Sequence, residues 1–552
     1  MIVRSIVIAL FAATTVYACA GAPDTGVART DYRSPLDRPQ TAKAYSHFLV
    51  GRFAALTNDP REAAFNYAAA LETIPGDRSV AERAVFAALL ADDFEGAAEV
   101  AKTIGRDRET NVSLARLVTA VDRLRRNDPA AAVADLDGAD FGPFNTMVAH
   151  NLAAWAELER GGLEAARGRL IENRTGDNLL DGVTLNMVGF LQLAAERDDA
   201  ALETFDTVWT SGARLAVATE AHARLLAERG ETDRAITLLK DFAEDVGRNP
   251  GVTDLLERIE AGERIKAYRP TVRQGAALAV YAPAAALAAQ TDGDLAGVYF
   301  AMALALDPQL DVARTLWGEA LDDAGRRADA IDVLDRVPER SPFYATAQGQ
   351  LAWVLRREGR NQEALETAIE ALNHTSDRDL KVQLGDLFRS LDRHGEAARI
   401  FDQVITSDEA EGRRDWRLLF ARGAARERMG NWPDAEVDLR AALAIAPDEP
   451  DVLNYLGYGL VDRGEHLDEA LALIRRAVKK SPRNGQIVDS LGWAYYRLGR
   501  YEEAVRHLER AVELEPGDVV LNDHLGDAYW QVGRTLEARF QWSRALNLAD
   551  GE

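Results

Sequence analysis

The chain has 552 residues, a formal net charge of −24, 47% hydrophobic residues and one cysteine. An apolar fraction near one half with a mean hydropathy of −0.23 excludes wholesale disorder and a polytopic membrane protein. The acidic pI of about 4.9 disfavours binding to nucleic acid or to anionic lipid surfaces. One cysteine excludes an intramolecular disulfide and a cysteine-rich zinc site.

Residues 1–18 have the pattern of an export signal peptide, with one positive charge at Arg4, an apolar run over Ile6–Phe11 and then small residues. Val16-Tyr17-Ala18-Cys19 resembles a bacterial lipobox, which implies cleavage before Cys19 and attachment of lipid to it. Ala18-Cys19-Ala20 also fits the A-x-A pattern of ordinary secretory cleavage, which would release a soluble periplasmic protein. Cys19 is therefore either the lipid attachment site or part of the discarded peptide.

Residues 19–43 are rich in small and polar residues without apolar periodicity, and they are predicted to form a flexible tether. No aspartate directly follows Cys19. The resemblance to enterobacterial lipoproteins then implies a location in the outer membrane, facing the periplasm.

An alanine recurs through the rest of the chain. The positions are Ala63, Ala97, Ala132, Ala166, Ala201, Ala235, Ala296, Ala330, Ala364, Ala397, Ala435, Ala470, Ala504 and Ala538. Successive spacings are 33 to 35 residues, except for 61 after Ala235 and 38 after Ala397. A fixed period of this length predicts a solenoid of stacked helix-turn-helix units, each with a first helix A and a second helix B.

The unit from Gly485 to Asp518 carries a small residue in each helix, Gly492 and Ala504, where the two helices must approach closely. Gly499 supplies a positive φ after helix A, and Pro516 follows helix B. With Leu491, Tyr495, Tyr501 and Ala511, these residues make the unit resemble a tetratricopeptide repeat, or TPR.

The resemblance implies an all-α superhelical solenoid of about fourteen repeats with one irregular break. We predict six repeats over residues 44–249, an irregular helical spacer over 250–276, and eight repeats over 277–552. A spacer helix is expected over 254–266. The spacer carries Arg258, Arg264, Lys266, Arg269 and Arg273, and it is either a solvated linker or a hinge that contacts a partner.

No motif for a metal, a nucleotide or another cofactor occurs, because the eight histidines never form HxH or HExxH and no phosphate-binding loop is present. Asp489, Ser490 and His524 could be imagined as a hydrolytic triad, but Ser490 lacks the setting of a nucleophile elbow. We therefore predict that the protein is not an enzyme.

The TPR resemblance implies that A helices line the concave surface of the array, with positions 2, 5, 9 and 12 of each unit exposed. In the last three units these positions include Asn454, Tyr458, Asp489, Trp493, Tyr496, Asp523, Asp527 and Trp530. Aromatic rings beside carboxylates suit a peptide or helix of a partner protein. The alternative is that the rings only cover the joints between successive helices.

The runs NYLGYGLVDRG and IVDSLGWAYYRLGRYEEAV resemble TPR lipoproteins of Gram-negative bacteria, a group that includes adaptors of carboxyl-terminal processing proteases. This resemblance implies a non-enzymatic envelope scaffold that recruits a periplasmic protease and its substrates. The alternative is a scaffold for outer-membrane assembly or for polysaccharide or protein export. No polar capping helix follows Leu548, so the C-terminal end is a candidate surface for homo-oligomers.

Overall fold

The computed structural model describes residues 39–74, 76–104, 113–138, 141–172, 178–288 and 293–549. These residues form helices and no strands. The predicted signal peptide, Cys19 and the tether up to residue 38 lie outside the described residues. In the described part of the chain, no helix combines the length and the hydropathy needed to cross a membrane.

Twenty-eight helices are described, in two stretches. The helices up to residue 260 are α1 (Pro39–Leu56), α2 (Pro60–Thr73), α3 (Arg78–Leu90), α4 (Phe94–Ile104), α5 (Ser113–Arg125), α6 (Pro129–Leu136), α7 (Gly142–Glu172), α8 (Asn178–Ala194), α9 (Asp198–Thr210), α10 (Ala216–Glu228), α11 (Thr232–Asp245) and α12 (Pro250–Glu260). The helices after it are α13 (Val272–Ala288), α14 (Gly293–Leu306), α15 (Asp311–Asp323), α16 (Arg327–Leu334), α17 (Tyr344–Arg357), α18 (Asn361–His374), α19 (Arg378–Ser390), α20 (His394–Ala410), α21 (Trp416–Arg428), α22 (Trp432–Ile445), α23 (Pro450–Arg463), α24 (Leu467–Lys480), α25 (Gly485–Arg497), α26 (Tyr501–Leu514), α27 (Val519–Gln531) and α28 (Thr535–Ala549).

Successive helices pair as A and B helices, and small residues hold each pair together. A Cβ atom added at Gly492 of α25 would lie 2.6 Å from Leu508 Cγ of α26, and one added at Gly385 of α19 would lie 2.6 Å from Phe401 of α20. Only glycine allows this approach without displacing the packed side chain of the neighbouring helix. Gly499 has a φ of 73° in the turn between α25 and α26, as the sequence predicts.

Helix α7 contains both helices of one pair, because Gly162 has a φ of 80° and interrupts the helical backbone. With α7 counted as a pair, six pairs precede α12 and eight follow it. The number of these pairs that are true tetratricopeptide units stays a prediction.

Two predicted boundaries differ from the structure. Helix α1 begins at Pro39, so residues 39–43 of the predicted tether are helical, and a proline is well tolerated at the first helical position. The spacer helix spans Pro250–Glu260 instead of 254–266, because the Asn249 side chain accepts the Gly251 and Val252 amides and caps the helix there. Residues 263–271 then run without helix to α13.

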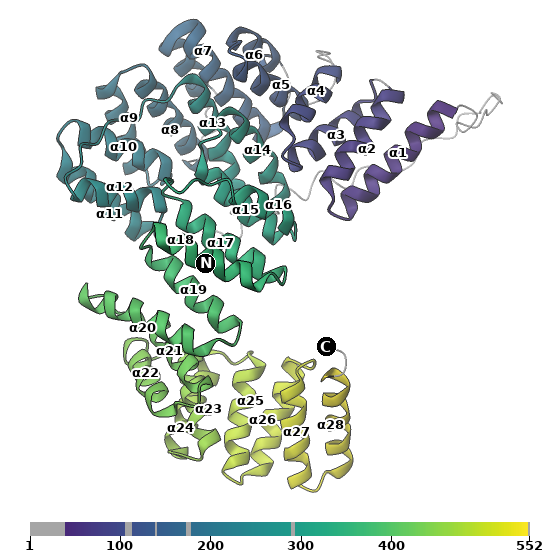
Figure 1. Ribbon diagram of the computed structural model, residues 1–552, viewed down its shortest axis with the longest axis vertical. Helices are drawn as coiled ribbons and strands as arrows, with labels where there is room; N and C mark the ends of the chain where they lie inside the picture. Colours follow the sequence, from purple (N-terminus) through teal and green to yellow (C-terminus); the bar gives the residue numbers. More distant parts are fainter. Residues whose placement is uncertain are drawn as a thin grey trace.

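Helices α13 and α14 leave the regular stack and lie inside the curve of the preceding helices (Figure 1). They pack against the A helices α3, α5, α7 and α8. Tyr299 of α14 packs edge-on against Phe144 of α7, and its hydroxyl donates to Asn145 Oδ1 at 2.5 Å. At the other end of this interface, Gly275 of α13 lies against the indole of Trp155 on α7. The chain thus fills the concave side of its own N-terminal repeats.

This position explains why both helices are rich in alanine and aliphatic residues on all sides. A helix that is apolar all round is stable in water only when it is buried. Val280, Ala284, Phe300 and Met302 are each at most 1% exposed. Helices α13 and α14 therefore form a central layer of the N-terminal body, which we call the inner pair.

Polar contacts also join the helices that follow the inner pair to the N-terminal repeats. Arg326, before α16, donates to the Leu90 carbonyl at the end of α3 at 2.6 Å, and its own side chain is 2% exposed. Arg336 pairs with Asp92 at 2.6 Å. Segments about 240 residues apart in sequence therefore meet, and helices α1–α16 form one body from which α17–α28 extend as an arc (Figure 1).

The arginines of the spacer region pair mainly within the chain. Arg258 binds Glu263 at 2.8 Å, and Arg269 binds Asp198 at 2.7 Å on α9. Arg273 donates to the Leu306 carbonyl at 3.2 Å and so links the two helices of the inner pair. These contacts favour the structural role of this segment over a role as a basic docking site.

Candidate partner-binding surface

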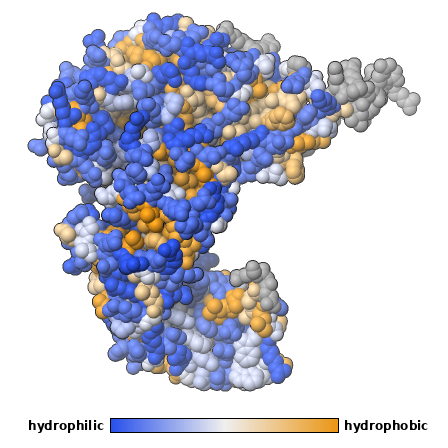
Figure 2. Space-filling model, in the orientation of Figure 1, coloured by the Kyte–Doolittle hydropathy of each residue, from blue (hydrophilic) through white to orange (hydrophobic). Residues whose placement is uncertain are grey.

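The eight predicted groove residues lie on three neighbouring A helices, α23, α25 and α27. Within each helix they are spaced by three or four residues, so they share one side of it. We call this surface the C-terminal A-helix face; its members are Asn454, Tyr458, Asp489, Trp493, Tyr496, Asp523, Asp527 and Trp530. In the space-filling view, a broad recess separates the N-terminal body from the last units (Figure 2).

Seven of the eight side chains are at least partly accessible. Asp523 and Trp530 are exposed, and Asn454, Tyr458, Trp493, Tyr496 and Asp527 are half-buried. The prediction that Asp489 is exposed is wrong, because this residue is only 4% exposed. Counting positions along one helix does not show that a side chain of the next unit covers Asp489.

That cover is His524 of α27. Its Nδ1 lies 2.9 Å from Asp489 Oδ2, and its ring stacks on Trp493 at 4.0 Å between centroids. Burial lowers the pKa of His524, but the carboxylates of Asp489, Asp523 and Asp527 together outweigh burial and raise it. The other oxygen of Asp489, Oδ1, is buried and has no hydrogen-bond partner.

The two tryptophans of the face differ in role. Trp493 stacks on both Tyr496, at 4.7 Å, and His524, so it covers the joint between α25 and α27. Trp530 is 48% exposed although it contacts Trp542 of α28 at 5.7 Å. The covering of joints therefore accounts for Trp493, whereas Trp530 offers free ring surface.

The imagined triad of Asp489, Ser490 and His524 does not assemble. The Ser490 hydroxyl donates to the Gln486 carbonyl of its own helix at 3.0 Å, and Ser490 is buried. The Nδ1 atom of His524 faces Asp489. In the described part of the chain, no group of three His, Cys, Asp or Glu residues is arranged to hold a metal ion.

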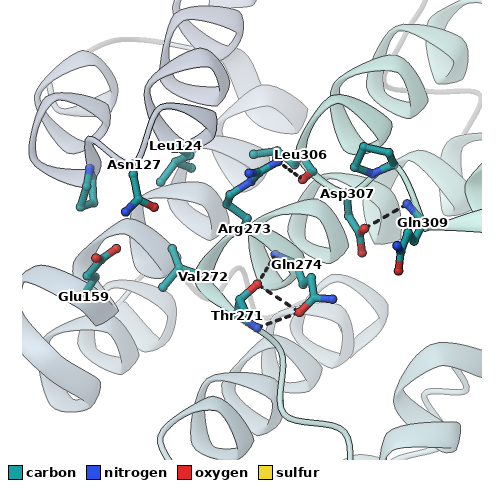
Figure 3. Close-up of a pocket in the computed structure, with 12 residues that line it drawn as sticks. Leu124, Asn127, Glu159, Thr271, Val272, Arg273, Gln274, Leu306, Asp307 and Gln309 are labelled. Carbon is teal, nitrogen blue, oxygen red and sulfur yellow. Dashed lines mark hydrogen bonds between the residues drawn. The ribbon is translucent and has the colours of Figure 1, made fainter.

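A cavity of about 660 Å³ lies at the edge of the inner pair, between α5, α7 and the ends of α13 and α14 (Figure 3). Its lining includes Leu124, Glu159, Arg273 and Asp307. The sequence predicts no pocket here, because the cavity exists only where the inner pair meets the N-terminal repeats. It is separate from the C-terminal A-helix face.

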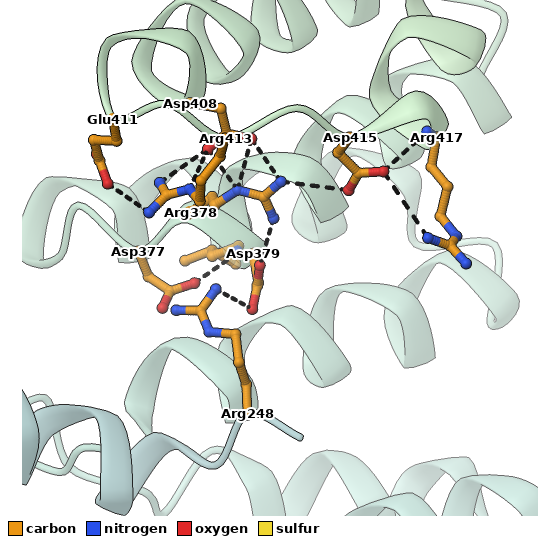
Figure 4. A network of polar contacts seen from close by, with 10 residues as sticks. Arg248, Asp377, Arg378, Asp379, Asp408, Glu411, Arg413, Asp415 and Arg417 are labelled. Atoms are coloured by element: carbon orange, nitrogen blue, oxygen red, sulfur yellow. Dashed lines mark hydrogen bonds and ion pairs between the residues drawn. The ribbon is translucent and has the colours of Figure 1, made fainter. Parts of the chain in front are cut away.

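A polar network joins the N-terminal body to the arc (Figure 4). Arg248, after α11, binds Asp379 of α19 at 2.8 Å. Beside it, Arg378 and Arg413 both bind the buried Asp408 of α20, at 2.7 and 2.9 Å. The Arg378 hydrogen bond, with the help of Arg413, lowers the pKa of Asp408. Asp408 and Arg413 lie between Ala397 and Ala435, the two recurring alanines that are 38 residues apart.

Comparison with known proteins gives a partial match. Residues 346–550 match the family model described as tetratricopeptide repeat. The TPR repeat-containing protein PA4667 of Pseudomonas aeruginosa is 30% identical over 191 residues, which are 35% of this chain and 32% of that protein. The match thus spans about a third of that relative.

Two solved structures show lower similarity. A tetratricopeptide repeat protein from Parabacteroides merdae is 18% identical, with a TM-score of 0.36, over 42% of this chain and 90% of that one. A chain of the APC/C hetero-tetramer Cut9-Hcn1 is 15% identical, with a TM-score of 0.37, over 94% and 96% of the two chains.

The family match covers helices α17–α28 and hence the whole C-terminal A-helix face. In the same region the A and B helices pair through small residues such as Gly385 and Gly492. Residues 346–550 are therefore a tetratricopeptide repeat array within an all-α superhelical solenoid.

Proposed function

We propose that this protein is a non-enzymatic scaffold of the bacterial cell envelope, which recruits a periplasmic protease and its substrates through the C-terminal A-helix face. One observation carries the proposal. The A helices α3, α5, α7 and α8 of the N-terminal body are covered by the inner pair, whereas α23, α25 and α27 make their main contacts with neighbouring helices of the array. The concave side of the last units is thus left for a partner.

Tetratricopeptide repeats indicate a scaffold for protein–protein interaction, and these proteins are generally not enzymes. The protease as partner is supported by the resemblance of the last hundred residues to adaptors of carboxyl-terminal processing proteases. An export or outer-membrane assembly machine is the second candidate. A crosslink from this face to an export component instead of a protease would favour that second candidate.

Two further features belong to the proposal. Lipid on Cys19 would hold the scaffold at the outer membrane, and loss of palmitate labelling in Cys19→Ala would distinguish this from a soluble periplasmic form.

A homo-oligomer would form through α28, where Leu536 and Phe540 lie one turn apart and are 78% and 64% exposed. Light scattering of Phe540→Asp against wild type tests that contact, and an unchanged mass above the monomer would refute it.

The capture of a purified carboxyl-terminal processing protease tests the main proposal. We expect the double variant Tyr458→Ala, Trp530→Ala to capture at least tenfold less protease than wild type, because two partly exposed aromatic contacts are removed. Phe65→Ala is the matched control, since this ring is 66% exposed on α2, far from the face. Equal capture by the double variant, with unchanged thermal unfolding, would refute the assignment of the face.

A further inference from the structure

Carboxylates on the preceding A helices have arginine partners within the chain. On α19, Asp386 pairs with Arg389 at 3.0 Å. On α21, Glu427 lies 3.7 Å from Arg463 Nη2 and accepts the Tyr455 hydroxyl. The array therefore neutralises the acidic side chains of its concave side at these units.

The last two units break this pattern. Asp489, Asp523 and Asp527 form no ion pair with any arginine or lysine among the residues that the structure describes, and Asp489 has only His524. These carboxylates act on one another, because burial and the charge of Asp523 raise the pKa of Asp527. Asp527 Oδ1 accepts a hydrogen bond from Trp542 Nε1 at 3.2 Å, which leaves Oδ2 for a partner. Negative charge is thus concentrated on α25 and α27, where His524 is the neighbouring titratable base and no arginine or lysine of the described residues pairs with these carboxylates.

A separate observation concerns polar atoms that are buried and unsatisfied on the same face. Asp489 is 4% exposed, yet its Oδ1 accepts no hydrogen bond, and Asn454 Oδ1 and Trp493 Nε1 also lack partners. Leaving such atoms unpaired costs free energy. The charge of Asp489 also reaches the half-buried Tyr458 on α23, where burial, Asp462 and Asp489 raise the pKa of the phenol. The unpaired polar atoms, two acceptors and one donor, therefore lie on the neighbouring helices α23 and α25.

We propose that the C-terminal A-helix face takes an arginine side chain of the partner, with the guanidinium bound by the carboxylates of Asp523 and Asp527 and packed on the exposed ring of Trp530. This inference rests on the proposed function and names the chemistry of the partner. Asp523, Asp527 and Trp530 are spaced four and three residues apart, so they lie along one side of α27.

Arginine fits this surface better than lysine. The planar guanidinium has five N–H donors, binds carboxylates in a fixed geometry and stacks on aromatic rings. A lysine ammonium supplies the charge but neither the plane nor the fork of donors. At α19 and α21 an arginine of the chain itself pairs with the carboxylate. At α27 we expect an arginine of the partner to take this place.

Isothermal titration of the full chain with three peptides tests the inference. The probe is the acetylated and amidated peptide GSLRLSG, together with versions that carry citrulline or lysine in place of arginine. Citrulline keeps the shape and removes the charge, so we expect at least tenfold weaker binding, with lysine in between. Raising the salt concentration should shrink the advantage of arginine, because screening weakens exposed charge pairs.

The double variant Asp523→Asn, Asp527→Asn removes the charges and keeps the shape. We expect it to bind the arginine peptide no better than wild type binds the citrulline peptide. Asp448→Asn, at an exposed carboxylate that lies between α22 and α23 and pairs with Lys480, is the control and should change nothing. Equal affinity for arginine and citrulline, or no binding of any peptide at millimolar concentration, overturns the inference.

The outcomes separate this inference from the proposed function. If the Asp523→Asn, Asp527→Asn variant captures the protease as wild type does, while the Tyr458→Ala, Trp530→Ala variant fails, the face binds a partner without an arginine site. If the peptides discriminate as expected but no protease is captured, the arginine site stands and the protease is not the partner.

Discussion

Replacement of Trp155 by alanine is expected to destabilise the N-terminal body by about 3 to 5 kcal/mol, the usual cost of removing a large aromatic side chain from a core. Trp155 is fully buried on α7, and its indole lies against Gly275 of the inner pair. Urea unfolding of the full chain measures the change. Trp530→Ala, which removes a half-exposed indole, should cost much less.

The same contact can be tested from its other side. A Cβ atom added at Gly275 would lie 2.2 Å from the Trp155 ring, so Gly275→Leu should also destabilise the body. If the two residues touch as described, the leucine will partly fill the space of the lost indole. The double variant Trp155→Ala, Gly275→Leu should then be more stable than the sum of the single changes predicts. Strict additivity would show that the inner pair does not pack against α7 in solution.

Replacement of Asp408 by asparagine is expected to cost about 3 kcal/mol at neutral pH, because it removes a buried charge that Arg378 and Arg413 share. The Asp408 side chain is 3% exposed and accepts hydrogen bonds from both guanidinium groups. Asp448→Asn provides the contrast, because that carboxylate is 64% exposed and pairs with Lys480 in solvent. It should cost much less than Asp408→Asn, because an exposed ion pair contributes little to stability.

The pH dependence of this difference has a definite sign. The pKa of Asp408 is lowered in the folded protein from an ordinary value of 3.8, so the unfolded chain takes up the proton first as the pH falls. The advantage of wild type over Asp408→Asn should therefore be constant above about pH 5. It should shrink as the pH falls below 3.8 towards the folded pKa. A difference that stays constant down to pH 2 would exclude the charge as its cause.

Repeat chemistry made much of the fold predictable. The alanine period and glycines such as Gly385 and Gly492 imply close A–B pairs, because only small residues let two helices approach so far, and the structure has these pairs. The positive φ of Gly499 follows from the same local pattern. The ends of helices do not follow from the repeat period. The spacer helix begins at Pro250, four residues before the predicted start, because Asn249 caps it there.

The candidate site was predictable only in part. Counting positions along single helices correctly grouped Asn454, Tyr458 and Trp530 on accessible A-helix surface. It failed for Asp489, because the exposure of a side chain also depends on the next unit, and His524 covers this one. No count along one helix contains that information.

The sequence by itself determined the helical class, the repeat period and the close crossings, since these depend on residues within one unit or its neighbour. Only the tertiary structure decided which concave surface stays open. Helices α13 and α14 keep the repeat period yet turn into the N-terminal curve, because surfaces that are apolar all round gain more from burial there than from a place in the stack. The last three A helices are left to carry partly exposed rings, such as Trp530, and carboxylates that have no arginine or lysine partner among the described residues.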